Sequence, residues 1–202
     1  AIRAARAFTK KKKVIKAGGA YHGWSDQMVF GMHIPGTGKL EATGIPDGCN
    51  ADTQEFFPND LGELRALLEE NNKVGGTAAV LVEPVGPESG TRPVPFDFNK
   101  KVRELCDEFG ALLIFDEVVT GFRLGMGGAQ GYFNVKPDLT VFGKCITGGY
   151  PMAGGVNTNS SFTDPCISRN ILWFISRPRE TVMFPFSHKR SHPIPTLVLK
   201  EL

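Results

Sequence analysis

The sequence lacks the features that mark secreted, membrane and metal-binding proteins. It has only four cysteines and four histidines; the cysteines form no CxxC pair and the histidines do not cluster. This argues against a disulfide framework or a zinc site and favours reduced thiols in an intracellular setting. No apolar run is long enough to cross a bilayer, and no secretory hydrophobic segment is present. We expect a globular protein of the cytoplasm, or of the plastid if the chain is of plant or algal origin.

An excess of charge of one sign is lacking too. The 23 Lys and Arg residues nearly balance the 21 Asp and Glu residues, for a net charge of +2. This balance gives no reason to expect a nucleic-acid or membrane partner. We interpret the basic run Lys10–Lys13 as a solvated helix end.

Glycine is absent from the last 46 residues, although the first 156 contain all 24. The charge balance changes at the same point: the tail has six Lys and Arg against three Asp and Glu, and the rest has 17 against 18. Long regular elements in the tail are prevented by four prolines: Pro178, Pro185, Pro193 and Pro195. We therefore divide the chain into a body, residues 1–156, and a divergent tail, residues 157–202, to which we assign no function.

The chain begins without a methionine. Its first seventeen residues are basic and free of acids, as transit peptides can be, but they read as the middle of a helix. We expect an internal start, with residues missing before Ala1.

Two apolar, strand-like runs are each followed by one charged residue. Asp116 follows Ala111–Phe115, and Lys144 follows Leu139–Phe142. In a parallel sheet, the carboxyl ends of the strands are where ligands gather. A lysine there can form an imine with a carbonyl, and a carboxylate can keep a ring nitrogen protonated. These are the two groups that a pyridoxal phosphate (PLP) site needs most, although each alone is also compatible with an ordinary capping carboxylate or surface lysine.

The pattern between these runs predicts an α/β fold. The continuous apolar run Thr77–Val82 is typical of a strand buried on both faces, and it ends in Glu83. A helix from Phe98 to Phe109, stopped by Gly110, leads into the strand before Asp116. Strand, helix and strand with short connections predict a parallel crossover.

Further elements are expected before this unit. Ala1–Phe8 has helical spacing, and Val14–Ile15 marks a short strand. Asn59 or Asp60 should cap a helix that runs to about Asn71. The segment from Phe30 to Phe57 is rich in glycine and proline, and we expect an irregular covering loop there.

Two glycine motifs fail on inspection. Pro35–Lys39 lacks the first glycine and the final Ser or Thr of a phosphate-binding P-loop. Gly125-Met126-Gly127 lacks the third glycine of the dinucleotide fingerprint, because Gln130 stands in its place. A nucleotide-binding α/β domain is therefore a distant alternative.

Several spaced blocks closely resemble the class III aminotransferases of PLP fold type I, and within that family the glutamate-1-semialdehyde 2,1-aminomutases. The blocks cover residues 1–156 in the right order: Tyr21–Gly23, Asn59–Leu61, Glu83–Val85, Phe115–Arg123, Gly127–Phe133, Pro137–Thr140 and Gly143–Lys144. The resemblance implies an incomplete three-layer α/β/α large domain with a mainly parallel central sheet. It also implies PLP as cofactor, a small amino acid or amine as substrate, and a homodimer in the complete enzyme.

The resemblance also implies roles for individual residues. Lys144 would be the Schiff-base lysine and proton carrier, and Asp116 the partner of the pyridine nitrogen. Tyr21 would stack on one face of the ring and Val118 would pack against the other. His22 and Glu83 are placed at the cofactor site by their motifs.

Departures from the family pattern leave the reaction open. The family's phosphate loop would lie upstream of Ala1. Phe30–Gly36 replaces a substrate-holding stretch of the aminomutases, Val119 replaces a methionine, and Glu88 stands where an asparagine is common. The predicted activity is therefore PLP-dependent amino transfer, within one molecule or between two, and the alternative is a truncated chain that is catalytically incompetent.

Overall fold

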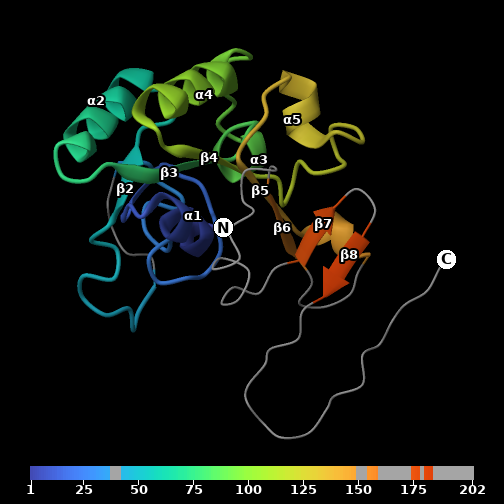
Figure 1. The fold of residues 1–202 in the computed structure, drawn as a ribbon, viewed down its shortest axis with the longest axis horizontal. Coiled ribbons are helices and arrows are strands. Elements are labelled where there is room, and N and C mark those ends of the chain that lie inside the picture. Colours follow the sequence, from blue (N-terminus) through green and yellow to red (C-terminus); the bar gives the residue numbers. More distant parts are fainter. Residues whose placement is uncertain (37–41, 149–153, 159–173, 178–179, 184–202) are drawn as a thin grey trace, which may run out of the picture.

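A computed structural model describes residues 1–36, 42–148, 154–158, 174–177 and 180–183. Its centre is a six-stranded sheet (Figure 1) in the order β2-β1-β3-β4-β5-β6. The first five of these strands are parallel, and β6 runs antiparallel to β5. The strands are β1 (Lys13–Ala17), β2 (Thr53–Phe56), β3 (Thr77–Val82), β4 (Leu112–Asp116), β5 (Leu139–Phe142) and β6 (Gly155–Thr158).

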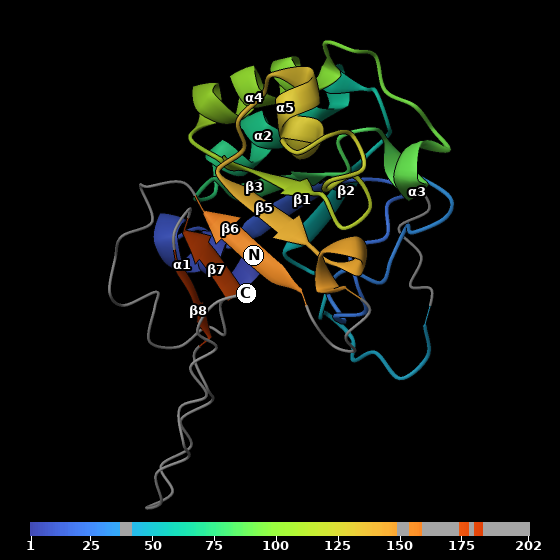
Figure 2. The same ribbon diagram turned by 90° about the vertical axis from the view of Figure 1, so that its right-hand side faces the viewer.

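Helices cover both faces of this sheet. One face carries α2 (Leu61–Asn72), α4 (Phe98–Phe109) and α5 (Gly128–Phe133), and the opposite face carries α1 (Ile2–Thr9) (Figures 1 and 2). Two short helical turns lie in connections after strands, α3 (Pro87–Gly90) after β3 and η1 (Lys144–Thr147) after β5. The predicted three-layer α/β/α architecture with a mainly parallel sheet is confirmed.

Two apolar cores lie on the two faces of the sheet. The core under α2 and α4 includes Phe56, Leu64, Val102 and Phe115. The core under α1 includes Ala4, Met28, Ile114 and Leu139. All six residues of β3 are buried, as its continuous apolar sequence predicts for a central strand.

The ends of the helices follow from their capping residues. Asp60 Oδ1 accepts a hydrogen bond from Glu63 N at 2.8 Å and so caps α2. The Glu63 carboxylate does not bond back to Asp60; it accepts from Phe57 N at 2.6 Å. Gly110 ends α4 in the left-handed conformation, φ 58°, as expected for a glycine just after a helix.

The expectation of an irregular loop throughout Phe30–Phe57 is wrong at its carboxyl end, where β2 forms. This strand is short and lies at the edge of the sheet, with half-buried Gln54 and Glu55 in its centre. A polar, four-residue edge strand has no hydrophobic alternation to reveal it. The failed P-loop match at Pro35–Lys39 extends into residues outside the described part.

Two strands are described in the tail. β7 (Phe174–Arg177) pairs antiparallel with β8 (Glu180–Met183). β6 spans the position at which the composition changes, since it contains Val156 and Asn157. Among the described helices, none is long and apolar enough to cross a membrane.

Candidate active site

The candidate site lies along the edge formed by the carboxyl ends of the parallel strands. Because β2 lies on one side of β1 and β3 on the other, the direction of winding reverses between β1 and β3. Open α/β sheets bind ligands in the crevice at such a reversal. Glu83 directly follows β3, Asp116 ends β4, and Lys144 begins the turn after β5. Sequence segments far apart in the chain therefore bring their polar residues to one edge.

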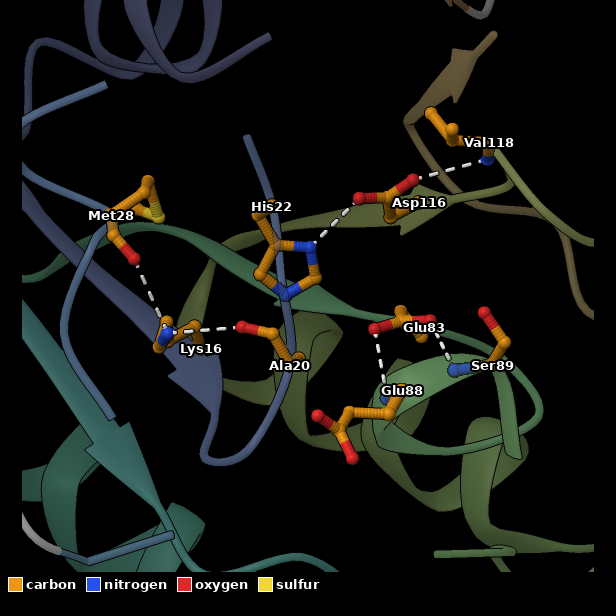
Figure 3. A network of polar contacts seen from close by, with 9 residues as sticks. All are labelled: Lys16, Ala20, His22, Met28, Glu83, Glu88, Ser89, Asp116 and Val118. Atoms are coloured by element: carbon orange, nitrogen blue, oxygen red, sulfur yellow. Dashed lines mark hydrogen bonds and ion pairs between the residues drawn. The ribbon is translucent and has the colours of Figure 1, made fainter. Parts of the chain in front are cut away.

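His22 and Asp116 form a buried pair at this edge (Figure 3). His22 Nδ1 lies 2.8 Å from Asp116 Oδ2, and the two side chains are 2% and 11% exposed. The other carboxylate oxygen, Oδ1, accepts from Val118 N at 3.1 Å. The carboxylate is therefore fixed from two sides, by a loop that follows β1 and by the backbone after β4. A pair of this kind keeps a buried carboxylate available as a proton acceptor for a ligand.

His22 also has an orphaned nitrogen. Its Nε2 is buried and has no hydrogen-bond partner in the described structure. In the neutral imidazole whose Nδ1 donates to Asp116, Nε2 is an acceptor. An unpartnered buried acceptor beside an oriented carboxylate fits a site that a polar ligand completes.

Glu83 lies close to this pair but faces a different backbone segment. Its carboxylate accepts from Glu88 N at 3.1 Å and from Ser89 N at 2.8 Å. Both donors have left-handed backbone, with φ 52° and 60°, which is strained for residues other than glycine. Burial raises the pKa of Glu83, with the nearby charges of His22 and Asp116 acting in opposite directions. Glu83 thus stabilises the strained turn beside the site.

Lys144 begins the turn after β5 and has an exposed side chain. Its backbone is also left-handed, φ 49°. β5 pairs directly with β4, with Val141 opposite Asp116, so the amine follows the strand next to the carboxylate. Backbone strain of this kind concentrates at functional sites, where the surrounding structure holds it in place.

The turn at Lys144 packs against the loop after β4. An added Cβ at Gly143 would lie 3.2 Å from Val118 Cγ1, so this position has no room to spare. Cys145 Sγ donates to Gly121 O at 3.1 Å. The predicted lysine is therefore held against the segment that contains Val118.

The six predicted site residues are placed unequally by the structure. His22, Asp116 and Val118 come together directly, and Glu83 lies beside them. Tyr21 precedes His22, and its side chain is about half exposed, at 52%. Lys144 follows the neighbouring strand.

Two of the departures from the aminomutase pattern meet in space. His33 Nδ1 lies 2.7 Å from Glu88 Oε1, in a pair that is largely exposed. Glu88 is also one of the two residues whose backbone Glu83 holds.

One important support of the site was not predicted from the sequence. Lys16, in β1, is completely buried, and its Nζ donates to Ala20 O, Met28 O and Phe30 O at 3.2, 3.5 and 2.6 Å. These carbonyls belong to the segment after β1 that contains Tyr21 and His22, and Figure 3 shows the contacts to Ala20 and Met28. A lysine inside a strand buried on both faces was the available clue, because such a charge must find partners.

Other candidate chemistry is absent from the part of the chain that the structure describes. No group of three or more His, Cys, Asp or Glu residues there could hold a metal ion. Cys49, Cys106 and Cys145 are free thiols, and burial raises the pKa of Cys106 to about 12. An open pocket of about 420 Å³ lies beside α5, with Phe122, Gln130, Lys136 and Phe142 among its lining residues.

Comparison with known proteins identifies the family. The sequence profile of the class-III aminotransferases matches residues 1–167. The chain is 46% identical over 154 residues, 75% of its length, to glutamate-1-semialdehyde 2,1-aminomutases from Lachnoclostridium phytofermentans and Acetivibrio thermocellus. It spans only 36% of the length of each of these relatives.

Solved structures agree with this assignment. An omega-transaminase from Sphaerobacter thermophilus matches 82% of the chain and 39% of its own, with a TM-score of 0.72 and 33% identity. A glutamate-1-semialdehyde aminomutase from Pseudomonas aeruginosa, in complex with PMP, matches 77% of the chain and 33% of its own, with a TM-score of 0.63 and 31% identity. The chain therefore belongs to the class III aminotransferases, a family of PLP-dependent enzymes.

Proposed function

We propose that this chain carries the PLP-binding part of an amino-transferring enzyme, with Asp116 and Lys144 as its two principal contacts to the cofactor. The observation that supports this most strongly is the buried pair of His22 and Asp116 at the strand edge, one strand away from Lys144. A carboxylate fixed in this way can accept the N–H of a pyridinium ring. The orphaned His22 Nε2 adds an acceptor that suits a polar ligand.

PLP, when bound, supplies an electron sink for the carbanion formed as a proton leaves the substrate. Residues of this chain are placed to bind the cofactor and to move that proton. Asp116 would accept the N–H of the pyridine ring, and His22 Nδ1 orients that carboxylate. The Lys144 amine, at the start of the turn after β5, would hold the cofactor through its aldehyde carbon. The same amine would be placed to take up the substrate's proton and return it.

The remaining predicted residues would shape the site. Tyr21 offers an exposed ring for stacking, and Val118, in the loop after β4, offers an apolar side chain at the same edge of the sheet. Glu83 would support the site indirectly, because its carboxylate holds the strained turn at Glu88 and Ser89.

We propose that the substrate is a small amino acid or amine and that the complete enzyme is a cytoplasmic homodimer. The names of the relatives favour an intramolecular amino transfer of the aminomutase kind. The pair of His33 and Glu88 lies at two departures from the family pattern, so a transaminase acting on a different substrate is the other candidate. We further propose that residues 1–156 form a partial cofactor domain and that residues 157–202 form a divergent tail.

A titration with PLP tests the cofactor proposal. The purified chain should develop the visible absorption band of a protonated imine with increasing PLP. Lys144→Ala should abolish the band. Lys136→Ala, a matched control at an exposed lysine of the connection before β5, should leave it unchanged.

A folded chain without such a band would favour the second candidate, a catalytically incompetent fragment. The observation behind this alternative is the 36% coverage of the relatives' length. A band that persists in Lys144→Ala would contradict the role of Lys144 itself.

A further inference from the structure

We infer that Glu117 is a positioning residue that fixes the carboxylate of Asp116 and the amine of Lys144 relative to each other. The inference rests on the proposed function for its consequence, but its structural part stands on the contacts of Glu117. The residue types alone do not show that Glu117 and its neighbour Asp116 have different roles. The two adjacent carboxylates nevertheless have different surroundings.

The Glu117 side chain is buried inside the molecule and accepts four hydrogen bonds. The residue is 1% exposed. Its Oε2 accepts from Thr120 Oγ1 at 3.2 Å and from Ala129 N at 2.6 Å. Its Oε1 accepts from Gln130 N at 3.2 Å and from Gln130 Nε2 at 3.1 Å. Two carboxylate oxygens surrounded only by donors form a strong contact that an uncharged side chain of the same size cannot reproduce.

These contacts close the loop that follows Asp116. The loop leaves β4, runs through Val118 and Gly121, and returns at the first turn of α5, where Ala129 and Gln130 donate. Gly128 has φ 59°, and a Cβ there would overlap Glu117 Oε2. The glycine is therefore required by the close approach of the carboxylate as well as by its backbone conformation.

The same loop contacts both halves of the proposed cofactor site. On one side, Val118 N donates to Asp116 Oδ1. On the other, Gly143 packs against Val118, and Cys145 Sγ donates to Gly121 O. The residues before and after Lys144 thus rest on the loop that Glu117 closes.

Glu117 is also tied to β5. Its own backbone N donates to Val141 O at 2.9 Å, and its partner Gln130 Nε2 lies 3.4 Å from Thr140 Oγ1. Glu117, through its side chain, its backbone N and its partner Gln130, therefore connects the end of β4, the start of α5 and the strand that leads to Lys144. Positional errors of about 1 Å in a reacting group can reduce rates by up to about a hundredfold, so such a connection has a functional consequence.

The test compares Glu117→Gln with a core variant, Val102→Ala, chosen because Val102 is fully buried in α4, away from the site. Melting temperatures establish how far each variant is destabilised, and the comparison is made at equal folded fraction. If Glu117→Gln does not fold, Gln130→Met replaces it, since this change removes only the Nε2 donor. The readouts are the rate at which the chain forms its covalent PLP adduct, the pH midpoint of the adduct's absorption band, and amide hydrogen exchange without PLP.

The inference predicts that Glu117→Gln slows adduct formation by about tenfold or more and shifts the pH midpoint. Amides of residues 118–121 and 143–146 should exchange faster without PLP. Val102→Ala should change neither the rate nor the midpoint, nor exchange in these segments. Equal behaviour of the two variants in all three readouts would overturn the inference.

The proposed function and the inference can fail separately. If the unaltered chain forms no adduct at Lys144, the proposed function fails. Amide hydrogen exchange without PLP then tests the inference by itself. The inference is supported if amides around Lys144 exchange faster in Glu117→Gln than in the unaltered chain, and do not do so in Val102→Ala. Unchanged exchange in that segment contradicts it.

Discussion

Asp116 and Lys144 follow neighbouring parallel strands, yet their surroundings differ. The acid half of the site, consisting of His22, Glu83 and Asp116, is buried, and each member has hydrogen-bond partners from other segments. The amine half consists of Gly143 and the short 3-10 turn Lys144–Thr147. Lys144 itself is exposed and has a left-handed backbone conformation.

This difference indicates which part of the site is formed in advance. The acid half is held by β1, β3 and β4 and by the loops after them, so it needs no ligand to take its shape. The amine half rests on the loop that Glu117 closes, through Gly143 and Cys145. We therefore expect mutations to affect stability mainly through the acid half and its core, and cofactor binding through both halves.

The largest effect should come from removing the core beneath both halves. Phe115 is completely buried in β4, next to Asp116. Phe115→Ala should lower the free energy of unfolding by about 3–5 kcal/mol, because it leaves a cavity. Urea unfolding measures this. Met126→Ala, at a residue that is 87% exposed, should change it by less than about 0.5 kcal/mol. Similar losses in the two variants would contradict the described core.

Next in size is a change confined to the acid half. Asp116→Asn keeps an oxygen that can accept from Val118 N but removes the charge. A charge-assisted hydrogen bond contributes about 1.5–3 kcal/mol, so PLP affinity should fall about tenfold to a hundredfold. Asp107→Asn, on the exposed surface of α4, is the control. Unchanged affinity in Asp116→Asn would show that the ring nitrogen does not lie at Asp116.

A smaller effect is expected from a site remote from both halves. Asp60→Ala removes the N-cap of α2 and should lower the free energy of unfolding by about 1 kcal/mol. PLP affinity should not change, because α2 packs on the core that contains Phe56 and Val102 and the cap at Asp60 bonds within the described helix, not to the proposed cofactor site. Asp60→Asn, which keeps an acceptor oxygen, should recover most of the stability. Loss of PLP affinity in Asp60→Ala would mean that stability and cofactor binding cannot be separated as we propose.

The smallest expected effect is a difference in pH dependence. Burial raises the pKa of Glu83 above its ordinary value. The folded chain therefore holds this proton more tightly than the unfolded chain. The stabilisation is fully present below the unfolded pKa and is lost as pH rises through the folded pKa. Between acid and neutral pH, the free energy of unfolding of the unaltered chain should fall relative to that of Glu83→Gln.

Urea unfolding at a series of pH values measures this difference, and Glu104→Gln on the exposed side of α4 controls for net charge. A difference between the unaltered chain and Glu83→Gln that stays constant, or that changes in the opposite direction, would contradict the burial of this carboxylate.

The central elements of the fold could be predicted from the sequence because their patterns are strong. β3 is a continuous apolar run, α4 has a clear apolar face and a terminal glycine, and β5 was placed with its observed bounds. β2 and β6 were missed. Both are four-residue edge strands with half-buried centres, so tertiary pairing and not local hydrophobicity determines them.

The sequence motifs identify residues of the candidate site, but they do not predict the hydrogen bonds that join those residues. Motifs placed His22 and Asp116 near one cofactor, but 94 residues separate them, and no local pattern predicts that Nδ1 and Oδ2 meet at 2.8 Å. The supporting roles of Lys16 and Glu117 were not predicted at all. Each depends on backbone groups that only the folded chain brings together.

The most direct test of the proposed site is to locate the covalent bond. The chain is mixed with PLP, reduced with borohydride and digested, and the modified peptide is identified by mass spectrometry. Our account predicts a single modified lysine, Lys144, and no modification there in Lys144→Ala. Modification of other lysines with Lys144 unmodified, in a chain shown to be folded, would contradict the assignment of the amine half and with it the proposed cofactor site.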